Sequence, residues 1–310
     1  MKIGVTMLFA ILWCAGSLAA QSPTPTPAPA PRVPTGTRLP QRGERPGDGL
    51  ERLRSLEIRR TTVDPIYSSA ALEVRRALYR KPTKEETLTL AVAQHLNEKY
   101  ASFLESPRTG IVRLSGASGC GESTEVVSAN CVHNNIPGAG TAFSFRFGSY
   151  RLPRLADLIL SDRVLKSDGA MQQAIMVRLG DVPLEQVTLD TKGLKYLVDF
   201  EPGQDKASLL ATDIKHSKGV RADGFVYGLG FYVSNDTTFA LRSIAYRGTA
   251  LRSVDGFTYN ELDFDKRRDI LVAFRIVDVE PNGNITIIWK VLADKKAPEL
   301  SLKEEQAEKR

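Results

Sequence analysis

The sequence contains few of the residues that build metal arrays and disulfide-rich scaffolds. Its 310 residues include only three cysteines and three histidines. So few of both exclude a zinc-finger array and a small fold that depends on several disulfides. Aromatic residues make up 7% of the chain, which gives no sign of an extended platform for stacking sugars.

The overall composition is that of a globular protein. Apolar residues make up 42% of the chain, charged residues 25%, and the mean hydropathy is −0.20. These values exclude a protein with several membrane spans and a wholly disordered chain. The length is enough for one or two domains with a sizeable core.

The first twenty residues have the pattern of a secretory signal peptide. Lys2 supplies a short charged region, an apolar stretch runs to Trp13, and small residues ending at Ala19 and Ala20 provide the cleavage site. The short start is typical of bacteria. Two alternatives are an uncleaved anchor and a lipid on Cys14, but the bulky Trp13 before this cysteine disfavours lipidation. We expect cleavage, and therefore a periplasmic or secreted protein with no transmembrane span in the mature chain.

Residues 21–47 are predicted to form an extended, proline-rich tether. Residues 21–46 hold eight of the 17 prolines, which remove backbone donors and favour a solvated polyproline conformation. This segment is either a spacer or a disordered N-terminus. Its basic residues are candidates for weak contact with an anionic surface: Arg32, Arg38, Arg42 and Arg45.

The positive charge is concentrated at this end of the chain. Residues 21–60 carry eight arginines against four acidic side chains, whereas residues 61–310 carry 33 basic and 32 acidic side chains. The body of the chain is therefore almost neutral. We expect no nucleic acid among its partners.

Residues 48–106 are predicted to hold two or three helices. Asp64-Pro65 is a typical helix start. Thr83 and Glu86 form a capping box, and the apolar residues that follow predict one helix continuing to about Ser106. His95 lies in this helix, where a boundary residue is the ordinary interpretation and a ligand or proton shuttle the alternative.

Residues 107–293 are predicted to form a β-rich domain, and residues 294–310 a charged, flexible tail. The expected fold is mostly β (α+β overall), an antiparallel β-sandwich or a barrel-like sheet preceded by the helical region. Short β-prone runs occupy residues 111–114, 125–127, 142–147, 156–160, 174–179, 187–189 and 195–200. Two hairpins are predicted, one turning at residues 234–236 and one at Asn282-Gly283, where we expect a type I′ turn. Alternation in residues 285–292 predicts a strand that is covered on both faces.

Cys120 and Cys131 are the only cysteines outside the signal peptide, and we predict that they form a disulfide in the oxidising compartment. The alternative is that Cys120 is a nucleophile with His133 as its base. Ser118 lies in a glycine-rich run that resembles a phosphate loop or a nucleophile elbow. This run lacks the residue spacing of either motif.

Two acidic segments are candidate metal sites. Glu261, Asp263 and Asp265 alternate, so in a strand they would share one face and could hold Ca²⁺. Neutralisation by the basic residues at 266–268, on a solvated face, is the simpler interpretation. Residues 278–284 match half of an EF-hand loop, but β-prone sequence surrounds them and a hairpin turn is expected.

The sequence gives no catalytic, cofactor or metal residues, and we expect neither cofactor nor metal. The function expected from it is that of an exported, envelope-associated binding, adaptor or structural protein without catalytic activity. Its partners would be other envelope proteins or cell-wall components. The alternative is an exported hydrolase, with an acid/base carboxylate pair or with Ser118 or Cys120 as nucleophile in the β-rich domain.

Overall fold

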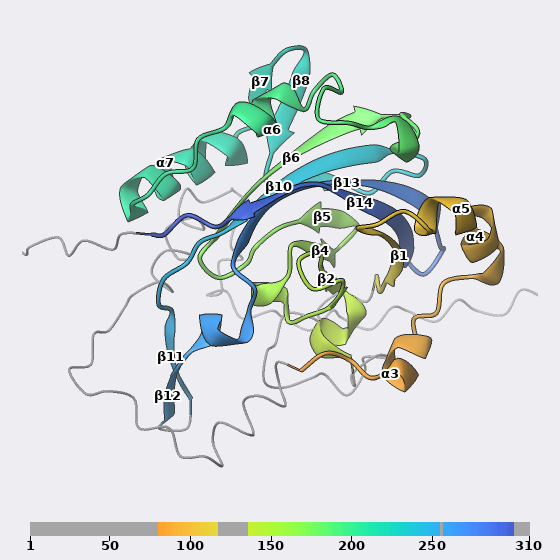
Figure 1. Cartoon of the computed structure of the whole chain (residues 1–310), viewed down its shortest axis with the longest axis horizontal. Coiled ribbons are helices and arrows are strands. Elements are labelled where there is room, and N and C mark those ends of the chain that lie inside the picture. Colours follow the sequence, from red (N-terminus) through yellow and green to blue (C-terminus); the bar gives the residue numbers. More distant parts are fainter. Residues whose placement is uncertain (1–79, 117–135, 255–256, 301–310) are drawn as a thin grey trace, which may run out of the picture. The chain divides into compact units, whose positions relative to one another are not determined.

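A computed structural model describes residues 80–116, 136–254 and 257–300 (Figure 1). Within this part the fold is mostly β, with two antiparallel sheets and few helices, and it resembles a sandwich. The predicted signal peptide, the tether, the helix start at Asp64 and both cysteines of the predicted disulfide lie outside the described residues.

The larger sheet has seven strands in the order β1-β14-β13-β10-β6-β8-β7, and all its pairs are antiparallel. Its strands are β1 (Thr109–Leu114), β6 (Gln172–Gly180), β7 (Val220–Ala222), β8 (Phe225–Gly228), β10 (Thr238–Ala245), β13 (Arg268–Val279) and β14 (Ile285–Lys296).

The smaller sheet has five strands in the order β3-β2-β4-β5-β9. Its strands are β2 (Ala142–Ser144), β3 (Ser149–Tyr150), β4 (Leu158–Ser161), β5 (Val164–Lys166) and β9 (Gly230–Tyr232). Strand β8 pairs with β6 of the larger sheet, whereas β9, which follows after Leu229, pairs with β5 of the smaller one. The chain therefore passes from one sheet to the other at this corner.

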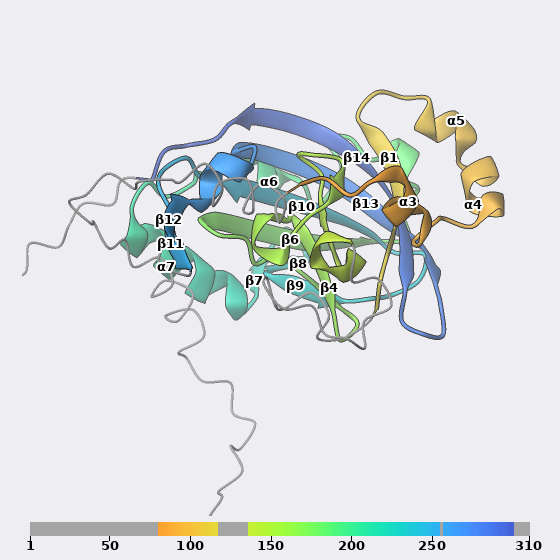
Figure 2. The ribbon, with the colours of Figure 1, turned by 90° about the horizontal axis from the view of Figure 1, so that it is seen from below.

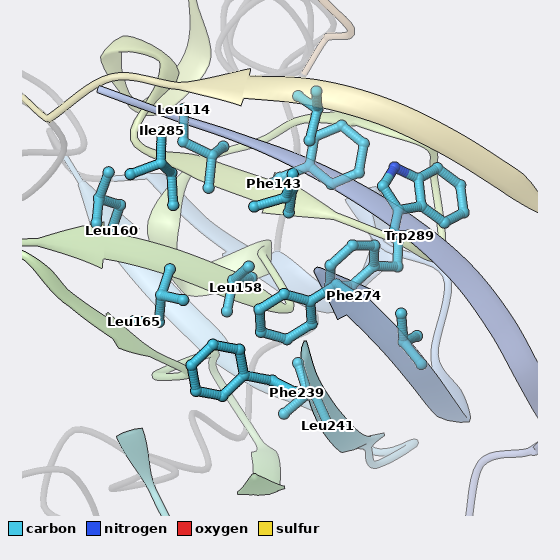
Figure 3. Packing of buried hydrophobic residues seen from close by; sticks show 14 of the residues in the cluster. Leu114, Phe143, Leu158, Leu160, Leu165, Phe239, Leu241, Phe274, Ile285 and Trp289 are labelled. Atoms are coloured by element: carbon cyan, nitrogen blue, oxygen red, sulfur yellow. The ribbon is translucent and has the colours of Figure 1, made fainter. Parts of the chain in front are cut away.

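The main hydrophobic core fills the space between the two sheets (Figure 3). Alternate residues of the central strands point into it, among them Phe239 of β10, Phe274 of β13 and Trp289 of β14. Phe143 of β2 and Phe145 of the turn after it lie tilted against Trp289 and edge-on to it, at centroid distances of 6.0 and 5.5 Å. The aromatic contacts therefore join the two layers.

The opposite face of the larger sheet is covered as well. Figure 1 shows α6 (Lys195–Asp199) and α7 (Lys206–Ser217) on the side away from the smaller sheet. A second cluster of buried residues lies on this face, including Ile288 of β14 and Leu197 of α6. The predicted two-sided burial of residues 285–292 is confirmed.

Two of the predicted strands on this side are wrong. Residues 195–199 form α6, and residues 187–189 follow a short 3₁₀-helix, η3 (Leu184–Gln186). Leu194 and Leu197 are both fully buried, which is the i, i+3 spacing of a helix. A segment of only five residues is too short for the period of a helix to be told from that of a strand. Helix α7, which Asp205 caps, was not predicted.

Three short helices precede β1: α3 (Lys84–Leu88), α4 (Gln94–Lys99) and α5 (Ala101–Leu104). The capping box of Thr83 and Glu86 is confirmed. The single helix predicted to about Ser106 is instead interrupted after Leu88, which is 70% exposed. Both views place α4 and α5 beside the β1 end of the larger sheet (Figures 1 and 2).

The two predicted hairpins have different outcomes. Strands β13 and β14 pair across the predicted turn, but only Gly283 has a positive φ, and Gly283 N–H donates to Glu280 O, so the turn is not type I′. Positive φ angles at both loop residues, as a type I′ turn requires, occur in a different hairpin, where Asp162 and Arg163 join β4 to β5. The first hairpin is wrong, because β10 pairs with β6 and β13 and not with β8 or β9, the two strands directly before it in the sequence.

A further hairpin lies outside both sheets. Strands β11 (Leu251–Val254) and β12 (Phe257–Asn260) pair only with each other and connect β10 to β13. Figure 1 shows this hairpin, called the arm below, projecting away from the sheets. It is followed by the 3₁₀-helix η4 (Glu261–Phe264).

The charged tail begins later than predicted. Strand β14 continues to Lys296, and Ala297 and Leu300 are buried. The backbone of Arg247 bonds to Pro298 and Leu300, so the segment packs against the end of β10.

Candidate functional site

Apolar packing and hydrogen bonds both occur at the base of the arm. Tyr259 at the end of β12 is buried against Leu152 and Leu155, with Phe264 beside it. The Asn260 side chain accepts hydrogen bonds from the backbone N–H groups of Ala250 and Leu262. The arm is therefore fixed to the body at its base.

A buried ionic network lies under this base, with Arg146 at its centre. The Arg146 side chain is fully buried, with Nε 2.9 Å from Asp157 and Nη1 2.8 Å from Asp265. Arg267 contacts the same carboxylate oxygen of Asp265, at 2.6 Å. Breaking such a buried pair by removing one partner is costly, so this network fixes the local structure.

Asp157 connects the network to both sheets. Its two carboxylate oxygens accept hydrogen bonds from Ser144 of β2 at 2.9 Å and from Ser243 of β10 at 2.6 Å. Ser243 also contacts the amide of Gln172, at the start of β6. This arrangement satisfies a carboxylate that has no exposure to solvent.

Arg267 holds the chain segments around the network in place. Its guanidinium donates to the backbone carbonyls of Ala170, Met171 and Tyr246 at 2.6–2.8 Å. Met171, whose side chain is buried, has a backbone φ of +46°, which is unfavourable for any residue other than glycine. Burial lowers the pKa of Arg267 to about 10, although the neighbouring carboxylate of Asp265 acts in the opposite direction.

The three acidic residues considered for Ca²⁺ do not share a face. They lie in and after η4, not in a strand, because the side chain of Asn260 caps this turn. Glu261 pairs with Arg154, Asp263 accepts a bond from Asn260, and Asp265 belongs to the network. The solvated face is wrong for Glu261 and Asp265, whose side chains are buried. Nowhere in the described ranges do three or more metal-ligating residues gather.

Cationic groups surround the ring of Phe147, in the turn between β2 and β3. Lys81, Arg151 and Lys266 come from three segments and lie 5.9, 4.3 and 5.2 Å from the ring centroid. The name Phe147 surface is used below for these four residues. Arg151 also donates to Phe264 O at 2.7 Å, which joins this surface to the arm's base. Burial lowers the pKa of Arg151, and Arg146 lowers it further, against the effect of Asp265.

The two histidines among the described residues differ in burial. His95 on α4 is exposed and is not a boundary residue. His216 is 1% exposed, and its ring lies between Tyr196 Oη at 2.9 Å and Thr212 O at 2.8 Å. Burial lowers the pKa of His216. Ser118, Cys120 and His133 fall outside the described residues, so the nucleophile alternatives and the disulfide stay predictions.

Arg146, Phe147, Arg151 and Asp157 are not among the residues predicted from the sequence. A signal was available, since Arg146, Arg151 and Arg154 are close together in the sequence and interleaved with Phe147 and Tyr150. Arg146 forms ion pairs with both Asp157 and Asp265, so its guanidinium links these two carboxylates. Chemically, the arrangement suits the anchoring of a projecting element and the binding of an anion.

Comparison with protein-family models, with curated proteins and with solved structures finds no match. Among the helices of the described ranges, none combines the length and the apolar character needed to cross a membrane.

Proposed function

We propose that this protein is an exported, envelope-associated binding module without catalytic activity, and that the arm is its contact element. Export rests on the signal-like N-terminus and envelope association on the proline-rich segment after it. The contact role is supported by one observation above all, the anchoring of a projecting two-stranded hairpin by buried ion pairs.

The energetics of hairpins supports this interpretation. A two-stranded hairpin is at best marginally stable in water, and the arm has no third strand among the described residues. At its base, in contrast, Glu261 pairs with Arg154, and Asp265 pairs with two buried arginines. Such anchoring holds the arm in a fixed orientation, which lowers the entropic cost of binding a partner.

The experiment shortens the arm without changing its base. Residues 254–257 are replaced by Asn-Gly, which joins Ser253 directly to its register partner Thr258 by a two-residue turn. Mature protein and variant are each used to capture components from envelope extract, and captured species are quantified by mass spectrometry. A species that contacts the arm should be depleted at least about tenfold with the variant.

The matched control is the double variant Lys295→Gln, Lys296→Gln, which changes two exposed residues at the end of β14. It should capture the same species as the unmodified protein. Both variants should melt within a few degrees of the unmodified protein. Equal capture by the shortened variant would show that the arm is not the contact element.

A further inference from the structure

Among the described residues, Lys81 and Lys266 add positive charge to the Phe147 surface, where they lie with Arg151 around one ring. The buried network next to it pairs Arg146 and Arg267 with Asp157 and Asp265. The two carboxylates are bonded to the deeper arginines, Arg146 and Arg267. No carboxylate of the described residues forms an ion pair with Lys81 or Lys266.

The three cationic groups come close together around one aromatic ring. Lys81 and Lys266 are exposed, but both ammonium groups lie within 6 Å of the centroid of the ring that Arg151 covers at 4.3 Å. Two ammonium groups that lie 5.9 and 5.2 Å from the same centroid are at most about 11 Å apart. Their like charges repel, and contact with the ring face offsets only part of this repulsion. The backbone N–H of Arg146, next to Phe147, donates to Asp157 at 3.2 Å and helps to fix the turn.

We propose that the Phe147 surface is a binding site for a phosphate group. A phosphate carries up to two negative charges and several acceptor oxygens, and lysine ammonium groups bind it as point charges. It would sit between Lys81 and Lys266 and reduce the repulsion among the three cations. A carboxylate carries half that charge and is the weaker ligand. None of the four residues of this site belongs to β11 or β12, so the proposal does not depend on the function proposed above.

The test titrates the full mature chain with pyrophosphate in a calorimeter at low ionic strength and neutral pH. Binding should weaken as NaCl is added, because exposed charges are screened. Lys81→Gln and Lys266→Gln should each weaken binding about three- to fivefold, and the two together about tenfold or more. The double variant at Lys295 and Lys296 removes the same charge elsewhere and should bind within twofold of the unmodified protein.

Two further measurements identify the chemical class of the ligand. Acetate at matched ionic strength should bind at least about tenfold more weakly than pyrophosphate. Cosedimentation with phosphatidylglycerol vesicles, lost in the Lys81/Lys266 variant, would assign the phosphate to a lipid headgroup. Pyrophosphate binding without cosedimentation would assign it to a soluble phosphate compound.

Several results would overturn the proposal. They are the absence of pyrophosphate binding, equal binding by the Lys81/Lys266 variant, an equal loss in the Lys295/Lys296 variant, or acetate binding as tightly as pyrophosphate. Both lysines are exposed, so folding should be unaffected, and a melting curve recorded for each variant checks this.

Discussion

Asp265→Asn is expected to be among the most destabilising single changes of charge in the described part of the chain. The substitution keeps the size of the side chain but removes the negative charge that faces Arg146 at 2.8 Å and Arg267 at 2.6 Å. Neither arginine can move its charge into water, since the Arg146 side chain is fully buried and that of Arg267 is 8% exposed. Removing one partner of a buried pair costs about 3–5 kcal/mol.

The chain offers a matched control in Asp181→Asn. Arg275 and Asp181 are also 2.6 Å apart, but the Asp181 side chain is 81% exposed, whereas that of Asp265 is fully buried. An exposed pair contributes about 0–1 kcal/mol. Both substitutions therefore remove the same charge over the same distance, and they differ chiefly in burial.

Urea unfolding of the three proteins measures the difference. At about 2 kcal/mol per M of urea, Asp265→Asn should lower the midpoint by about 1.5–2.5 M and Asp181→Asn by less than about 0.5 M. A cost below about 1 kcal/mol for Asp265→Asn, or equal costs for the two variants, would refute the view that the buried network anchors the base of the arm.

Two further predictions concern other parts of the fold. Burial lowers the pKa of His216 in the folded state, so below about pH 6.5 the unfolded chain binds more protons. The contribution of His216 to the free energy of unfolding should therefore be fully present above this pH and fall by up to about 1.4 kcal/mol per pH unit below it. The variant His216→Gln should not show this fall. Identical pH profiles for the two proteins would contradict the lowered pKa of His216. Gly116→Ala would place a Cβ 2.3 Å from the backbone of Gly283 and should cost about 1–3 kcal/mol. Gly228→Ala, whose Cβ would find its nearest neighbour at 3.6 Å, is the control, and equal melting temperatures for these two variants would exclude the close contact.

The mostly β fold could be predicted because the long strands have strict alternation. In β14, Ile285, Ile287 and Trp289 point into the main core while Ile288 points to the second cluster, which is the pattern seen in the sequence. Strand pairing was harder to predict. Residues 227–246 looked like one hairpin, but β8 and β9 bond to different sheets and β10 lies between β6 and β13. Alternation specifies the faces of a strand and carries no information about its neighbours.

The polar site could not be predicted because its members are far apart in the sequence. Arg146 and Asp265 are separated by 119 positions and meet only after both sheets have formed. The alternation of Glu261, Asp263 and Asp265 was read with the period of a strand, whereas the cap at Asn260 turns the chain into a 3₁₀-helix. The spacing of the acidic residues predicted a strand, but the hydrogen bond from the backbone N–H of Leu262 to the Asn260 side chain favours a helical turn at this position.

The insertion of the arm between β10 and β13 makes the body a natural display scaffold. Both ends of the insertion are held together at its base, where the backbone N–H of Glu261 donates to Ala250 O at 2.9 Å. The sheet register on either side is set by the pairing of β10 with β13, which includes no residue of the arm. Doubling the length of such a loop costs only about 0.6 kcal/mol in closure entropy. The hairpin can therefore change in length and sequence independently of the sandwich, so the arm and the stability of the fold can evolve, or be engineered, separately.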